Sequence, residues 1–165
     1  MTDAQVPREA IPVREPADHE VAAGAIAGLT GAIAMWLPAM IASPGEQGFL
    51  FPLRLVAASV MGASALDTGS GAAPALVGAL LILLMAVLCG LVFVSILPES
   101  ATSVRASLAG AVYGVALYAP AWYGFVRVAD PILYSAGLAL PVPLLHAVYG
   151  MVLGLQVPVL RKILP

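Results

Sequence analysis

The sequence predicts an all-α polytopic membrane protein with four transmembrane helices and a short surface or re-entrant helix between the first and the second. Composition is the first observation behind this prediction: of 165 residues, 61% are hydrophobic and 10% are charged, whereas soluble domains are about 25% charged. The distribution of the charges is the second, because seven of them lie in the first 20 positions and only nine serve the other 145 residues. So few charges cannot make a water-soluble surface, which excludes a soluble globular enzyme.

The uncharged stretches between these charges divide the chain into spans. Four stretches contain 25, 31, 21 and 30 residues, and a helix needs about 20 apolar residues to cross the hydrocarbon of a bilayer. Each span must also satisfy its own backbone hydrogen bonds in lipid, which favours helices. Within a transmembrane domain over residues 21–165 we therefore expect spans at about 21–42, 74–97, 106–128 and 143–160.

Residues 1–20 form a polar, proline-rich segment in front of the first span. Pro7, Pro12 and Pro16 alternate with charges there, a composition that favours irregular chain over helix. We expect a cytoplasmic tail, either flexible or bound to a partner subunit.

Glycines recur at a spacing of four in three of the predicted helices, as the pairs Gly24/Gly28, Gly110/Gly114 and Gly150/Gly154. Small residues at this spacing let two helix backbones approach closely within a membrane. We expect these faces to be helix-packing sites. Helix 74–97 is rich in Leu and Val and poor in small residues, so we expect it to face lipid.

Two connections contain short apolar segments of their own. In the first, Pro52 suits an initial helical turn and predicts a helix over about 52–65, either a lid on the bundle or a re-entrant pore element. The second connection, 129–142, contains Asp130, which lies three residues after Arg127 and close enough for a local ion pair.

The basic residues predict an orientation. With four spans, five basic residues share a side with both termini and two lie opposite, which favours cytoplasmic termini by the positive-inside rule. The expected location is the inner membrane of a bacterium.

Few residues of the predicted spans could bind a cofactor or take part in a reaction. Cys89 is the single cysteine, and His146 is the single histidine within a span. We expect no cofactor and no metal; a quinone or haem contact through His146 is the one cofactor interaction that the residues leave open. Thr30, Ser95 and Gln156 are the main polar side chains of the spans. Motifs for phosphate binding, metalloprotease or hydrolase chemistry are missing from the sequence, so no catalytic residue and no enzymatic activity are expected.

Aromatic and charged residues gather on the side opposite the termini. This periplasmic-interface surface contains Trp36, Arg54, Trp122, Tyr123, Arg127 and Asp130. An aromatic belt with anchoring charges is one interpretation, and a docking or ligand surface is the other.

The two halves of the chain show a faint internal repeat. Aligning Gly28 with Gly110 also aligns Pro38 with Pro120 and Trp36 with Tyr118. Such an alignment is typical of a parallel two-plus-two repeat, as found in small transporters.

The runs GFLFPLRLVAAS (residues 48–59) and HAVYGMVLG (residues 146–154) resemble segments of a loose group of small four-helix bacterial inner-membrane proteins. The resemblance implies the architecture and no activity. From the glycine faces and the missing catalytic motifs we expect a small non-catalytic subunit of a bacterial energy-transducing complex, respiratory or photosynthetic. Its partners would be other integral membrane subunits and lipid, with no nucleic acid. The alternative is a small oligomeric permease or channel for a small solute.

Overall fold

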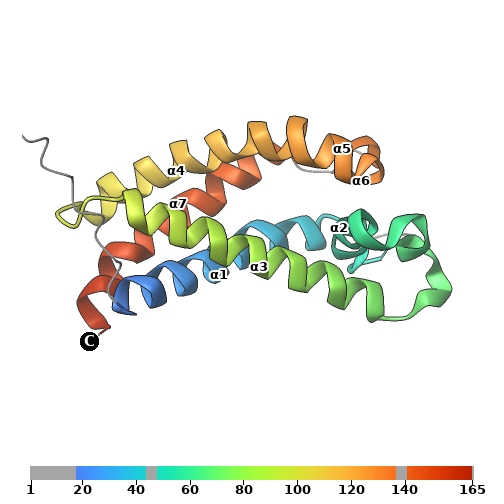
Figure 1. The fold of residues 1–165 in the computed structure, drawn as a ribbon, viewed down its shortest axis with the longest axis horizontal. Helices are drawn as coiled ribbons and strands as arrows, with labels where there is room; N and C mark the ends of the chain where they lie inside the picture. The colour runs from blue at the N-terminus through green and yellow to red at the C-terminus, as the bar shows by residue number, and fades with distance from the viewer. Residues whose placement is uncertain (1–17, 44–47, 137–140, 165) are drawn as a thin grey trace, which may run out of the picture.

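The computed structural model describes residues 18–43, 48–136 and 141–164, and this part of the chain is helical and contains no strand (Figure 1). Most of the predicted tail, residues 1–17, lies outside the described residues. Helix α1 (Asp18–Ile41) begins three residues before the predicted span. Asp18 and Glu20 lie in its first turn, where the helix dipole favours carboxylates.

Three helices are long and apolar enough to cross a membrane, which makes the chain a multi-pass membrane protein by length and composition. They are α1, α3 (Ala73–Ile96) and α7 (Val142–Ile163). These bounds agree with the predicted spans 21–42, 74–97 and 143–160 to within about one helical turn.

The predicted span 106–128 is divided into three elements. Helix α4 (Ser103–Ala119) continues directly into the π-helix η3 (Pro120–Val126) and the short helix α5 (Arg127–Ala129). Pro120 explains the change, because it has no N–H to donate and its ring clashes with the carbonyl four residues earlier. A π-helical turn widens the helix and accommodates that clash.

The first connection contains helix α2 (Phe51–Met61) and two 3-10 turns, η1 (Gly62–Leu66) and η2 (Thr68–Ser70). The α-helix ends four residues earlier than the predicted 52–65, because Gly62 adopts a φ of 69°, in the left-handed region. The second connection contains helix α6 (Pro131–Ala136).

Helix α2 packs between α3 and α6 and buries Pro52, Leu55, Ala57 and Ala58. The backbone of Leu53 and Ala57 lies directly against Gly78 of α3, and Leu55 is 1% exposed. Ala57 packs against Ile132 of α6 as part of a small apolar cluster. The short helix therefore joins the two halves of the molecule at one end of the bundle.

The long helices form two antiparallel pairs, α1 with α3 and α4 with α7. In the first pair, Gly24 lies against Gly90, and Gly28 lies against Ala86. In the second pair, Gly110 lies against Gly150. A methyl group on Gly28 or on Gly110 would overlap the carbonyl oxygen opposite, so both crossings require a residue without a side chain.

The two pairs cross through corresponding contacts. The contact between Gly28 and Ala86 in the first pair corresponds to the contact between Gly110 and Gly150 in the second. One helical turn away, Gly24 contacts Gly90 in the first pair. The corresponding contact in the second pair joins Ala106 and Gly154. The remaining member of the predicted set, Gly114, lies against the backbone of His146. This geometry agrees with the alignment of Gly28 with Gly110.

Helix α3, which we expected to face lipid, is exposed on one face only. One face is buried and carries Gly78, Ala86, Gly90 and Phe93, while Leu80 on the other face is 66% exposed. The prediction missed this face because it counted glycines at a spacing of four, whereas Ala86 and Gly90 form an alanine–glycine pair.

The centre of the bundle is filled by aromatic and aliphatic side chains. The ring of Tyr149 on α7 lies over Gly31 of α1, and its hydroxyl donates to the carbonyl of Ala86 over 3.0 Å. The hydroxyl of Tyr113 donates to the carbonyl of Cys89 over 2.8 Å. Each tyrosine therefore ties one helix pair to the other.

The crossing geometry predicts the effect of adding one methyl group. We expect Gly110→Ala to lower the free energy of unfolding by about 1–3 kcal/mol, because the helices must separate to admit it. The measurement is thermal unfolding in detergent. Gly124→Ala in η3 is the control, since a methyl there meets no described atom within 4 Å. Equal stability of the two variants would contradict the importance of the crossing.

Candidate functional site

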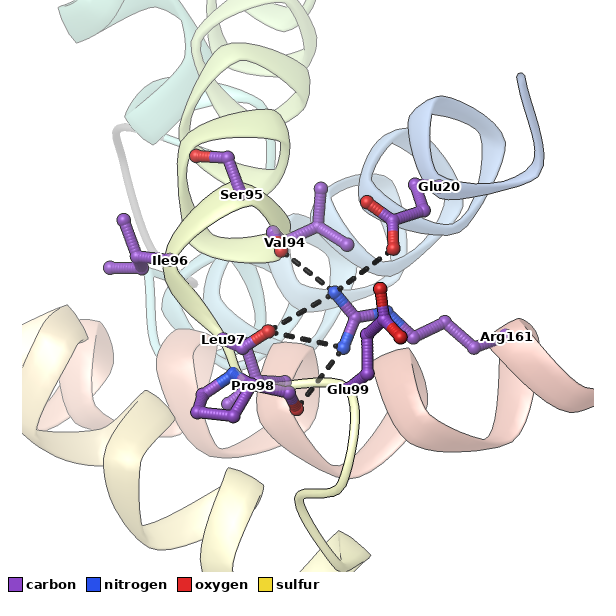
Figure 2. A pocket seen from close by; sticks show the side chains of 8 residues that line it. All are labelled: Glu20, Val94, Ser95, Ile96, Leu97, Pro98, Glu99 and Arg161. Carbon is purple, nitrogen blue, oxygen red and sulfur yellow. Dashed lines mark hydrogen bonds and ion pairs between the residues drawn. The ribbon is translucent and has the colours of Figure 1, made fainter. Parts of the chain in front are cut away.

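A network of polar groups lies at the end of the bundle where α1 begins and α3 and α7 end, which we call the Arg161 end (Figure 2). An open pocket of about 300 Å³ is found there. Its walls come from α1, α7 and the C-terminal turn of α3 with the residues that follow. The lining residues are Glu20, Val94, Ser95, Ile96, Leu97, Pro98, Glu99 and Arg161.

The guanidinium of Arg161 closes the C-terminus of α3. It donates to the carbonyl oxygens of Val94 over 2.8 Å, of Leu97 over 3.2 Å and of Pro98 over 3.3 Å. Pro98 follows Leu97, which is pushed out of the helical region and ends α3 there. The last carbonyls of a helix have no partner within it, and the planar guanidinium supplies several donors at once.

Glu20 of α1 completes this network. Its carboxylate lies 3.6 Å from the guanidinium, and the two side chains are only 12% and 10% exposed. Charges removed from water to this extent need a partner, so Glu20 and Arg161 stabilise each other while they join three helices (Figure 2). We did not predict this pair, although both charges flank spans at the same expected side of the membrane.

The chemistry of this pocket is electrostatic and structural. The terminal nitrogens of Arg161 are occupied by backbone carbonyls and by Glu20, whereas its Nε is buried and has no hydrogen-bond partner among the described residues. Within the described ranges, no group of three His, Cys, Asp or Glu side chains could hold a metal ion. The arrangement fixes the ends of α1, α3 and α7 relative to each other.

His146, the predicted cofactor contact, lies one turn into α7. Its Nδ1 is 3.0 Å from the carbonyl oxygen of Val142, and the ring of Tyr118 meets it edge-on at 5.6 Å. When Nδ1 donates to that carbonyl, Nε2 is the nitrogen left to bind a ligand. A haem or quinone would thus have to be held through Nε2.

His146 lies at the edge of an aromatic cluster, which it contacts through Tyr118. Tyr118 lies 6.2 Å from Trp122 and 5.7 Å from Tyr123, and Trp122 lies 5.6 Å from Tyr134 of α6. Trp122 and Tyr123 belong to the π-helix η3. Both residues belong to the predicted periplasmic-interface surface, and the structure brings them together with Tyr118, Tyr134 and His146.

Trp36 and Arg54, two other members of the predicted periplasmic-interface surface, belong to α1 and α2 and make no described ring contact with this cluster. Trp36 lies in a groove beside α2 and α3. Arg54 donates to the carbonyls of Asp67 over 3.3 Å and of Gly71 over 2.7 Å, and so holds the turn at η2 against α2. The predicted surface is therefore divided between two regions of the molecule.

The predicted ion pair between Arg127 and Asp130 is wrong. Arg127 is exposed, whereas Asp130 is 2% exposed and its Oδ1 accepts the N–H of Leu133 over 3.0 Å. Asp130 interrupts the helix between α5 and α6, and its carboxylate satisfies a free N–H in the first turn of α6. Burial raises the pKa of this carboxyl above its usual value, and the bond from Leu133 opposes that shift.

A further polar contact within the bundle joins the candidate spans α1 and α7. The hydroxyl of Thr30 on α1 lies 2.8 Å from Oε1 of Gln156 on α7 and also lies 3.0 Å from the carbonyls of Ile26 and Ala27. Hydrogen bonds of this kind contribute about 0.6 kcal/mol on average between membrane helices. The contact therefore supports the pairing of α1 with α7 and does not form a polar path.

Arg161 gives a direct test of the helix-end network. We expect Arg161→Gln to lower the free energy of unfolding by about 3 kcal/mol, because Glu20 and the last carbonyls of α3 lose their partner. Arg161→Lys should lose about 1–2 kcal/mol, since an ammonium cannot reach all three carbonyls. The measurement is thermal unfolding in detergent. Lys162→Gln is the exposed control, and an equal loss there would refute the network.

Asp130 predicts a pH dependence. Because its folded-state pKa is raised, the charged carboxylate destabilises the fold, and this penalty disappears as the pH falls through that pKa towards the ordinary value of 3.8. The wild-type chain should therefore gain stability relative to Asp130→Asn between pH 7 and pH ~4. Asp130→Ala loses the cap and about 1 kcal/mol at either pH. A pH-independent difference between wild type and Asp130→Asn would contradict this assignment.

Comparison of the chain with protein-family models, with curated proteins and with solved structures finds no match. The function is therefore inferred from the residues and contacts described above.

Proposed function

We propose that this chain is a small non-catalytic membrane subunit that crosses the bilayer four times and packs against larger integral membrane partners. The fourth crossing consists of α4, η3 and α5, which follow each other without a break from Ser103 to Ala129. This continuous helical segment runs antiparallel to α7, a candidate span, and is joined to it by the Gly110–Gly150 contact.

The distribution of positive charge supports an orientation with both termini in the cytoplasm. Arg105, Arg161 and Lys162 belong to helix ends at the Arg161 end, and Arg54 and Arg127 belong to elements at the opposite end. An excess of basic residues marks the cytoplasmic side. We propose the inner membrane of a bacterium and membership of an energy-transducing complex as the setting.

The filled centre of the bundle carries the proposal of a packing role. Phe93, Tyr149, Leu153 and Val157 are at most 5% exposed and occupy the space between the helices. Transport requires a path lined by polar groups or water, and ionisable residues within spans normally mark it. A packed centre suits a subunit whose outer surface does the work.

The glycine pairs do not supply that outer surface. Gly24, Gly28, Gly110, Gly114, Gly150 and Gly154 all contact other helices of the same chain. A partner would instead meet the exposed apolar faces, such as Val104, Leu108 and Val112 along α4, which are 65–71% exposed. These residues lie on one side of α4, at the spacing expected for one helix face.

A small permease or channel is the second candidate, and the corresponding crossings of the two helix pairs favour it. Internal repeats are typical of small transporters, in which one repeat moves against the other. The bond between Arg161 and the end of α3 would then hold the two repeats together at one end.

Purification in mild detergent tests the proposed function. We expect defined larger membrane subunits to co-purify with the tagged wild-type chain at a fixed ratio, measured by mass spectrometry. Val112→Trp should lower their recovery, because a bulky side chain disturbs an interface at the α4 face. Leu80→Trp, on the exposed face of α3, is the matched control and should leave the recovery unchanged.

A monomer without co-purifying subunits would contradict the proposed packing role. Uptake of a solute into vesicles that contain the chain alone would establish the permease instead.

A further inference from the structure

The carboxyl group of Asp130 is buried with only one of its two oxygens bonded. Asp130 lies between α5 and α6, at the end of the bundle opposite the Arg161 end (Figure 1), and is 2% exposed. Its Oδ1 accepts the N–H of Leu133 over 3.0 Å, whereas Oδ2 is buried and has no hydrogen-bond partner among the described residues. A carboxylate in this position loses its hydration without full replacement, which disfavours the charged form.

The ionisable side chains on the elements that pack around α6 do not compensate this charge. Arg54 of α2 donates to two backbone carbonyls of the turn at η2, and Arg127 of α5 is exposed. The hydroxyl of Tyr123 in η3 bonds to another tyrosine, and the ring of Tyr134 in α6 lies against Trp122. In the described part of the chain none of these groups is paired with Asp130. The neutral acid is therefore the form that this site accommodates.

The position of α6 depends on few contacts. The helix has six residues and is too short to be stable alone in water. Leu133 is 7% exposed, and Ile132 packs against the apolar cluster that contains Ala57 of α2. The ring of Tyr134 lies 5.6 Å from that of Trp122 in η3. These contacts and the bond from Leu133 to Asp130 hold α6 in place.

We propose that Asp130 is a proton-dependent switch, whose neutral carboxyl keeps α6 docked on α2 and η3 and whose loss of a proton releases α6. The ionised carboxylate gains hydration by leaving its site. This movement breaks the bond from Leu133 and withdraws Ile132 and Tyr134 from their neighbours. In the orientation proposed above, the switch responds to the pH on the periplasmic side, and it does not depend on the packing role.

The linkage sets the direction and the size of the response. Because burial raises the pKa of docked Asp130 above the ordinary value of 3.8, low pH favours the docked form. The ratio of released to docked α6 rises by up to about tenfold for each pH unit between these two pKa values and is constant above the higher one.

Trp122 makes the switch measurable, because it touches Tyr134 and the chain contains only two tryptophans. In the Trp36→Phe variant, Trp122 is the sole tryptophan. The probe is acrylamide, a neutral quencher that reaches tryptophans from water, added to vesicles that contain the full chain. We expect quenching of Trp122 to increase as the pH rises from ~4 to ~8, with the steepness of a one-proton transition.

Three further substitutions in the Trp36→Phe background assign this transition. Asp130→Asn keeps an oxygen acceptor for Leu133 and cannot ionise, so quenching should stay low at every pH. Asp67→Asn is the matched control, because it removes an exposed carboxyl from the other connection and should leave the transition unchanged. His146→Gln should also leave it unchanged, which excludes titration of the imidazole beside Tyr118. Thermal unfolding establishes that each variant retains the fold.

Two outcomes overturn the proposal: quenching of Trp122 that does not change with pH, and a transition that persists in Asp130→Asn. Hydrogen exchange of the wild-type chain tests the same switch without substitutions. After correction for the intrinsic effect of pH on exchange, protection of residues 131–136 should fall as the pH rises, while protection of α2, residues 51–61, stays constant. Equal changes in both helices would show a general loosening instead of the release of α6.

Discussion

Close approach of helix backbones is the constraint on which this fold depends. Between membrane helices the lipid removes the hydrophobic drive for association, so van der Waals contact and hydrogen bonds must supply it. The crossings at Gly28–Ala86 and Gly110–Gly150 allow that contact, because a methyl group on either first-named glycine would overlap the opposing carbonyl. Two rigid antiparallel pairs result. The arrangement of the four long helices then depends on the contacts that join these two pairs.

Three of the polar bridges between the pairs end on backbone carbonyls of α3 and of its C-terminal end, each of which can accept a second hydrogen bond. Tyr149 and Tyr113 donate to the carbonyls of Ala86 and Cys89 within α3, while Arg161 donates to the carbonyls at its end. The ring of Tyr149 fits only because Gly31 leaves space for it. The bridge of Tyr149 therefore depends on a small residue close to the Gly28–Ala86 crossing, and helix α3 is the element on which the three bridges meet.

The sequence was sufficient for the elements that depend on local composition and insufficient for those that depend on tertiary contacts. Long uncharged stretches predicted α1, α3 and α7 to within a turn, and Pro52 predicted α2. The buried face of α3 was missed, because an alanine such as Ala86 serves at a crossing as well as a glycine. The local ion pair of Asp130 was wrong because burial directs this carboxylate to the first turn of α6. The pairing of Glu20 with Arg161 joins residues 141 positions apart, a distance over which spacing carries no information.

The six glycines are used in contacts within the chain, so a partner subunit must bind elsewhere than on the glycine faces. A glycine face that meets its own neighbour is no longer open to another subunit, so the six glycines explain the rigidity of the bundle and not its affinity for others. What remains outside is a set of broad apolar faces, such as that of α4, where Val104, Leu108 and Val112 are exposed. Large side chains at the spacing of one helix face can pack against a partner helix. The outer face of α4 is therefore the side on which we expect a protein partner to pack.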